Sequence, residues 1–351
     1  MAISFTDFLS SVLASFPLAL TTLLTLGVIL VNGWTDAPNA IATAVSTRSI
    51  GIRSAVLMAA VMNFLGVVAM TSINRKVAVT IMSMVDFGGS QEESLLALCA
   101  AMVAIVVWAS AASVLGIPTS ESHALIAGLS GAAIALHGSL EGINPSEWAK
   151  VIYGLILSSV LGFFLGYVVC ASIKLFFHRL NRRRAESAFA KLQVLAAAGT
   201  AFMHGAQDGQ KFIGVFMLGL TLSAGGTEIV TEYAIPLWLM LLCSIVMGLG
   251  TSIGGARIIK SVGMDMVKMQ TYEGFSADLA GGLSLLVASV FGLPVSTTHT
   301  KTTAIMGVGA AKRISNVNWL VVRDMSLAWI LTFPGCGLIG YIMAKCFLAI
   351  F

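Results

Sequence analysis

The sequence has little charge, and this alone excludes most classes of protein. Only 10% of its 351 residues are charged, whereas about a quarter of a soluble domain is charged. Hydrophobic residues make up 57% of the chain, which indicates an integral membrane protein. The small net charge of +4 gives no reason to expect a nucleic-acid partner. We therefore expect the chain to be surrounded by a lipid bilayer.

The chain also lacks the residue patterns of an enzyme. Its five cysteines stand singly inside apolar runs, without the spacing of a metal site or a disulfide framework. There is no Walker-type glycine loop, metal-ligand cluster or nucleophile elbow. We predict that the protein is not an enzyme and holds no cofactor.

What the sequence does contain is a series of long apolar segments. Runs of about 18 to 25 apolar residues are long enough for helices to cross roughly 30 Å of hydrocarbon. We expect ten segments, near residues 14–46, 54–73, 94–115, 118–137, 149–177, 193–222, 234–252, 277–293, 295–311 and 319–349. The prediction is an all-α integral membrane protein with a five-segment half at 1–177, a basic linker at 178–192 and a second five-segment half at 193–351.

The linker indicates how the chain is oriented. Its stretch 178–191 is the strongest basic cluster of the protein, which places it in the cytoplasm by the positive-inside rule. An odd number of crossings in each half would insert the second half upside down. Loops in matching positions have opposite charges, namely Arg48 and Arg53 against Glu228 and Glu232, and Glu141 and Glu147 against Lys312 and Arg313. Arg75 and Lys76 do not fit this pattern. We predict an inverted-topology repeat in the plasma membrane, the arrangement of many secondary transporters.

Each half contains an interrupted helix with the same motif. Residues 116–123 and 292–299 both combine glycine and proline with hydroxyl side chains and a final histidine. A helix that starts inside apolar surroundings exposes backbone N–H groups, for which an anion is a suitable partner. The motifs predict two broken, re-entrant helical hairpins whose tips bind an anion. The candidate anion-binding residues at these tips are Thr119, Ser120, Ser122, Ser296, Thr297 and Thr298.

The residues of the two tips could also serve the hairpins themselves. Hydroxyls in membrane helices bond to the preceding turn of their own helix as well as to ligands. His123 and His299 could carry protons or could hold the tips in shape by hydrogen bonds. Glu121 would repel an anion, so we expect it to point away or to be protonated.

A second duplicated motif surrounds Asp36 and Asp208. A carboxylate inside the membrane costs about 2.5–3.5 kcal/mol on insertion scales, so each aspartate should have a partner or face water. Neighbouring glycine and proline predict local unwinding at both. Carboxylate, amide and carbonyl oxygens suit sodium, although the same carboxylates could carry a proton or could only cap the helices. The candidate cation-coupling residues are Asp36, Asn39, Thr43, Asp208 and Gln210, with Asp36, Asn39 and Asp208 as the sodium ligands.

The same motif contains two residues whose roles are less defined. Lys211 could neutralise Asp208 as a structural pair or could help to hold an anion while cations bind. Gln207 is a further candidate for contact with the anion.

These motifs resemble those of the PiT family of inorganic phosphate transporters. Residues 32–48 are similar to the family's first signature, residues 204–214 to its second, and the repeated Pro-x-Ser-x-x-His to its hairpin tips. The resemblance covers nearly the whole chain. It implies an inverted-repeat fold, a central phosphate held by the tip hydroxyls, and coupling to sodium or protons through the paired aspartates.

The sequence therefore predicts a secondary active symporter that imports inorganic phosphate with sodium or protons. A sulfate or related oxyanion permease, a passive anion pore and a membrane receptor without flux remain alternatives. The oligomeric state, including a homodimer, stays open.

Overall fold

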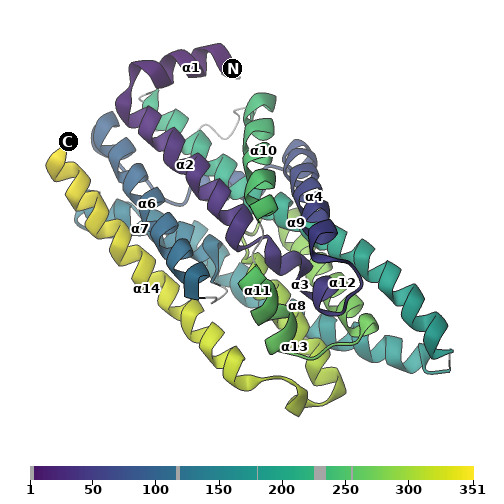
Figure 1. Ribbon diagram of the computed structural model, residues 1–351. Coiled ribbons are helices and arrows are strands. Elements are labelled where there is room, and N and C mark those ends of the chain that lie inside the picture. The colour runs from purple at the N-terminus through teal and green to yellow at the C-terminus, as the bar shows by residue number, and fades with distance from the viewer. Residues whose placement is uncertain (1–3, 116–118, 180, 225–234, 254–255) are drawn as a thin grey trace.

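The computed structural model describes residues 4–115, 119–179, 181–224, 235–253 and 256–351, and these residues are predominantly helical, with no strand among them. The helices of this part of the chain are α1 (Phe5–Ala14), α2 (Phe16–Thr35), α3 (Pro38–Ser46), α4 (Ile52–Ile73), α5 (Lys76–Met82), α6 (Gln91–Leu115), α7 (Glu121–His137), α8 (Pro145–Phe177), α9 (Arg182–Ser223), α10 (Leu237–Ile253), α11 (Ala256–Lys260), α12 (Thr271–Phe291), α13 (Thr297–Lys312) and α14 (Trp319–Ile350). Figure 1 shows them as one elongated bundle, with α14 along one edge.

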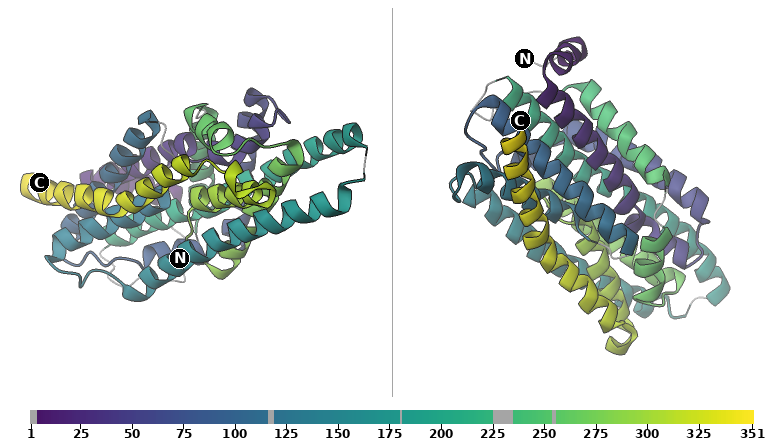
Figure 2. Two further views of the ribbon diagram at one scale, coloured as in Figure 1. Left: turned by 90° about the horizontal axis from the view of Figure 1, so that it is seen from below. Right: turned by 60° about the vertical axis from the view of Figure 1, so that its left-hand side comes forward.

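The all-helical membrane fold predicted from the sequence is confirmed. All ten predicted apolar segments form helices where the structure describes them. Six described helices are long and apolar enough to cross a membrane, and α10 with its bent continuation would be a seventh. Within the basic stretch 178–191, Arg182, Arg183 and Arg184 lie in the first turn of α9, whereas His178 and Arg179 follow the end of α8. Figure 2 shows the end of α8 and the start of α9 projecting together beyond the bundle.

The second interrupted helix forms the predicted hairpin. Helix α12 ends at Phe291, and its C-cap residue Gly292 has a positive φ of 72°. A side chain is strained in this conformation, and a Cβ there would also meet Lys76. The chain then turns, α13 begins at Thr297, and the two helices pack against each other. In the first half, α6 and α7 also pack together, while residues 116–118 of that motif lie outside the described residues.

The packing of the helices exchanges partners between the two halves. Helix α7 packs on α14, and its counterpart α13 packs on α8. In the same way α2 packs on α10, and α9 packs on α4. The second helix of each hairpin therefore packs against a helix from the other side of residues 178–192 in the sequence.

Glycines allow a close contact between α4 and α9. A Cβ on Gly66 would meet the backbone of Phe202, and a Cβ on Gly205 would meet the backbone of Asn63. Small residues at such crossings let helix backbones approach closely, which is how many membrane helices associate.

Replacing Gly205 by alanine should therefore lower stability. The added methyl group forces α4 and α9 apart, and overpacking of this kind costs about 1–3 kcal/mol. Gly199 lies on the same helix with nothing near its would-be Cβ, so Gly199→Ala is the matched control and should be neutral or mildly stabilising. The measurement is thermal unfolding of the two purified variants in detergent. Equal melting temperatures would contradict the assigned packing.

Candidate functional site

The two hairpin tips meet around the ammonium group of Lys211. Its Nζ donates to Ser122 Oγ of the first tip at 2.5 Å and to the Val295 carbonyl of the second tip at 2.6 Å. The rings of His123 and His299 pack edge to face, with their centroids 4.4 Å apart. The tips of the two halves therefore form one buried centre, as the duplicated motifs predict.

Each tip presents the start of a helix to this centre. Ser120 Oγ accepts from the His123 amide at 3.2 Å, and Ser296 Oγ accepts from the His299 amide at 3.1 Å, so both serines are N-caps. No hydrogen bond to another described residue occupies the amides of Thr297 and Thr298. Free amides at a helix start are a favourable place for an anion.

Two other residues were assigned to anion binding from the sequence, Thr119 and Gln207. Thr119 is half-buried just before the first tip helix. Gln207 donates to Ser289 Oγ at 2.8 Å and to the Leu293 carbonyl at 3.4 Å, so it ties α9 to the chain that leads into the second tip.

Asp36 lies at a break in the chain, as predicted. It caps α2 at the C-terminal end, and Pro38 starts α3. Its carboxylate is 2% exposed and accepts from Asn39 Nδ2 at 2.8 Å and Thr297 Oγ1 at 3.1 Å, and also from Thr298 Oγ1. The second tip is thus bonded directly to the first aspartate.

The predicted unwinding beside Asp208 is wrong, because α9 is continuous through this residue. The glycines on either side serve helix packing instead: a Cβ on Gly205 would meet Asn63, and one on Gly209 would meet Val67. Both contacts are with α4, so these glycines let α4 approach a straight helix.

The carboxylate of Asp208 nevertheless reaches the same centre. It accepts from Lys211 Nζ at 2.6 Å, from Asn32 Nδ2 at 3.1 Å and from Thr297 Oγ1 at 3.5 Å. Thr297 Oγ1 lies within hydrogen-bond distance of both carboxylates, so its one hydroxyl proton can be donated to either aspartate and the second tip links the two.

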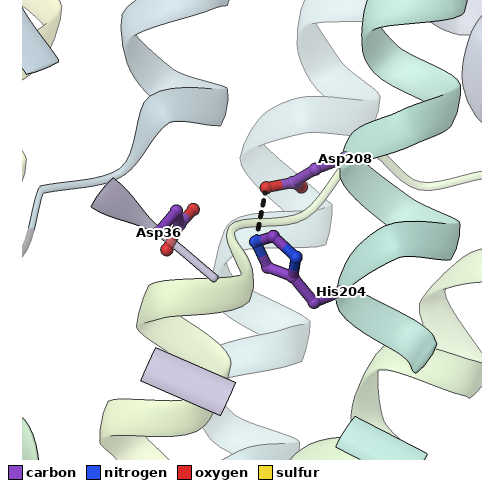
Figure 3. A group of neighbouring side chains, drawn as sticks. All are labelled: Asp36, His204 and Asp208. Carbon is purple, nitrogen blue, oxygen red and sulfur yellow. Dashed lines mark ion pairs between the residues drawn. The ribbon is translucent and has the colours of Figure 1, made fainter. Parts of the chain in front are cut away.

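His204 completes a group of possible ion ligands with the two aspartates. Its Nε2 lies 3.4 Å from Asp208 Oδ2, and one ligand atom from each of the three residues lies within 4.8 Å of the others. Figure 3 shows Asp36 approaching the pair on α9 from the opposite side. The side-chain amide oxygens of Asn32 and Asn39 (Oδ1) are buried without a partner among the described residues. Oxygen atoms of this kind suit a hard cation such as sodium.

Sequence reasoning did not assign a role to Asn32 or His204. The signal was present, because Asn32 precedes Asp36 by the same four residues that separate His204 from Asp208. Residues four apart share a helix face, so a polar residue at that position is directed to the same site as its aspartate.

Negative charge exceeds positive charge among the described residues at this centre. Glu121 is 1% exposed, and neither of its carboxyl oxygens has a hydrogen-bond partner among the described residues. An ionised carboxylate without a partner is costly there, which favours the protonated form expected as one alternative from the sequence. Two buried carboxylates, of Asp36 and Asp208, then share the centre with the single ammonium group of Lys211. Buried carboxylates in such excess favour a bound cation.

The structure does not bring two of the predicted coupling residues into this centre. Gln210 Nε2 donates to the Asn74 carbonyl at 2.6 Å, at the connection between α4 and α5. Thr43 donates to Asp278, which also contacts Lys301. The centre therefore consists of Ser122, Thr297, Thr298, Asp36, Asn39, Asp208 and Lys211 from the sequence prediction, joined by Asn32, His204 and Glu121.

Comparisons with known proteins agree with this arrangement. A solved structure titled "The sodium-dependent phosphate transporter" superimposes with a TM-score of 0.87, covering 96% of this chain and 100% of that chain at 22% identity. At that identity the match establishes the fold. Two relatives are named "Probable low-affinity inorganic phosphate transporter". The one from Bacillus subtilis (strain 168) is 37% identical, covering 89% of this chain and 91% of its own length. The one from Rhizobium meliloti (strain 1021) is 35% identical, covering 91% and 92%.

A model of the "Phosphate transporter family" matches residues 32–340, a range that begins at Asn32 of the first aspartate motif and includes both hairpins. This is a family of transporters and not a class of enzymes. The chain belongs to the phosphate transporter family.

Proposed function

We propose that the protein imports inorganic phosphate by symport with sodium. The observation that carries the proposal is the single buried centre in which the tips of both hairpins contact Asp36, Asp208 and Lys211. Family membership supports phosphate as the substrate. The solved neighbour, which is named for sodium dependence, supports sodium as the coupling ion.

Phosphate binds between the tips in this proposal. The free amides of Thr297 and Thr298 and the hydroxyls of Ser122, Thr297 and Thr298 donate to its oxygens, while Lys211 supplies positive charge. In the present structure the two threonine hydroxyls bond to Asp36. They must turn from the carboxylate to the anion, and a cation on Asp36 would make that exchange favourable.

Sodium binds first, at Asp36, Asn39 and Asp208. The excess of carboxylates would otherwise repel a phosphate dianion in surroundings where charges interact strongly. Cations at this site remove that repulsion, and the unpartnered oxygens of Asn32 and Asn39 add neutral ligands. Only the loaded centre is close enough to neutral to change its access across the membrane.

The exchange of packing partners supports the alternating access of two inverted halves, 1–177 and 193–351. Each hairpin rests on the last helix of the other half, so a movement of one half changes the surroundings of both tips together. The basic stretch 178–191 then faces the cytoplasm, and the protein resides in the plasma membrane.

Transport into proteoliposomes tests this function. An inward sodium gradient should drive radiolabelled phosphate above its equilibrium level, and replacement of sodium by choline should abolish this accumulation. Accumulation driven only by a pH gradient would identify the proton as the coupling ion. Equilibration without accumulation would indicate a passive pore, and stronger inhibition by sulfate than by unlabelled phosphate would indicate another oxyanion.

A further inference from the structure

A second buried ion pair lies outside the central site and has no role in the proposed function. The ammonium of Lys301 on α13 contacts the carboxylate of Asp278 on α12, and their side chains are 2% and 0% exposed. Thr43 of α3 also bonds to Asp278 and lies 3.2 Å from Lys301 Nζ. We call these three residues the lower layer.

The contacts of the lower layer leave half of the carboxylate unused. Lys301 and Thr43 both bond to Asp278 Oδ1. Its Oδ2 is buried without a hydrogen-bond partner among the described residues. An unpartnered buried carboxylate oxygen is costly. The ion pair therefore does not satisfy the whole carboxylate, and Oδ2 remains available to a further cation.

The lower layer is one step in a column of polar side chains along α3. Asp36, Asn39, Thr43 and Thr47 are spaced by three or four residues, so they follow one another along one face of the chain. Asn39 contacts the second tip through Thr298 at 2.9 Å, and Thr43 contacts the lower layer. The column therefore starts at the central site.

The other end of the column reaches a cavity. Thr47 and Ser49 both donate to Gln193 Oε1, at 2.8 and 2.7 Å. Thr47 also lines a cavity of about 610 Å³ together with Lys174, His178 and Glu186, at the end of the bundle where α8 stops and α9 starts. A continuous set of polar groups thus connects the central site with this cavity.

The opposite half has no such connection. Aligning the duplicated motifs on their aspartates pairs Thr43 with Val215, since each follows its aspartate by seven residues. Aligning them on their prolines pairs Asp278 with Met102 and Lys301 with Leu125. All three counterparts are apolar and fully buried in the largest core cluster. The lower layer therefore occurs in only one of the two repeated parts of the sequence, because the other part has apolar residues at the matching positions.

We propose that Asp278 is a second binding site for the coupling cation, on the route between the central site and the cavity lined by Thr47, and that Lys301 occupies it in the closed state. The inference rests on the proposed symport. A sodium ion that leaves Asp36 takes the place of the ammonium on Asp278. Lys301 is then released from α12, the two arms of the hairpin are freed at this level, and the route to the cavity opens.

The first test measures sodium binding to the full-length protein without phosphate. In Lys301→Met the Asp278 carboxylate loses its counter-ion, so sodium should replace the ammonium and stabilise the variant. Thermal unfolding is followed against sodium chloride, with choline chloride holding ionic strength constant. We expect half-saturation at a sodium concentration on the order of tenfold lower than in wild type, because the tethered ammonium no longer competes.

The double variant Asp278→Asn/Lys301→Met separates this site from a structural ion pair. It is neutral, and it should lose the added sodium response while keeping that of the central site. If Lys301→Met responds to sodium no more strongly than the double variant, Asp278 is not a cation site. Because this assay contains no phosphate, its outcome is independent of whether wild-type protein accumulates phosphate, which decides the proposed function.

Transport by the double variant gives a second readout that does not require Lys301→Met to fold. Phosphate binding should stay within a factor of about two of wild type, while sodium-driven uptake should fall on the order of tenfold, because the cation loses its intermediate site. Ser284→Ala, a buried change on α12 whose hydroxyl bonds only to its own helix at Ala280, is the matched control and should transport normally. Wild-type uptake by the double variant would overturn the proposal.

Discussion

Asp36→Asn should strongly reduce sodium-driven phosphate uptake. The carboxylate accepts hydrogen bonds from Asn39 and Thr297 and faces Asp208 across the proposed sodium site. An asparagine keeps the size of the side chain but removes the charge that holds the cation. Removing one charge from a buried hydrogen-bonded pair costs about 2–5 kcal/mol, so we expect uptake to fall by roughly a hundredfold at a given sodium concentration.

The matched control is Asp324→Asn, because Asp324 lies on α14 and its side chain is 58% exposed. Both variants are reconstituted at equal density, and initial rates of radiolabelled phosphate uptake are compared over a range of sodium concentrations. The control should keep the wild-type rate. If Asp36→Asn reaches the wild-type rate at saturating sodium, this aspartate is not a coupling residue.

The sequence predicts those parts of the site that depend on residues close together in the chain. Pro294 after an apolar run, followed by hydroxyls and His299, predicts a broken helix, because a proline prevents the chain from continuing its hydrogen bonds. The structure places the break there, with Ser296 as the N-cap. The repeat of this pattern in the first half predicts that two tips converge, and Lys211 joins them.

The errors arise where one residue type serves two physical purposes. Glycine beside Asp208 predicts unwinding, since glycine destabilises a helix. In the structure, Gly205 and Gly209 make room for α4, and α9 stays intact. The sequence does not show which helix will pack on such a glycine, so a local rule cannot distinguish a hinge from a contact surface.

Long-range pairing accounts for the misplacement of Thr43. Thr43 belongs to the motif around Asp36, and for this reason the sequence analysis assigned it to the central cation site. The structure shows that the motif extends over two layers, and the acid bonded to Thr43 is Asp278, from a helix more than two hundred positions away in the sequence. Neither Asp278 nor Lys301 belongs to a pattern that marks them as a pair.

The variant Lys211→Met should weaken phosphate binding and strengthen sodium binding, and these opposite changes would distinguish an anion-binding role of Lys211 from a structural one. Its ammonium lies 2.6 Å from Asp208 and bonds to both hairpin tips. In Lys211→Met the phosphate loses a charged donor, which is worth about 1.5–3 kcal/mol, so its dissociation constant should rise by at least tenfold. The freed carboxylate of Asp208 should bind sodium more tightly, and half-saturation should shift to lower sodium. A purely structural ion pair predicts instead that both affinities fall together, because removing one partner destabilises the fold.

Calorimetric titration of phosphate and sodium into the purified variant distinguishes the two outcomes. The control is Lys345→Met, an exposed change on α14, which should leave both affinities unchanged.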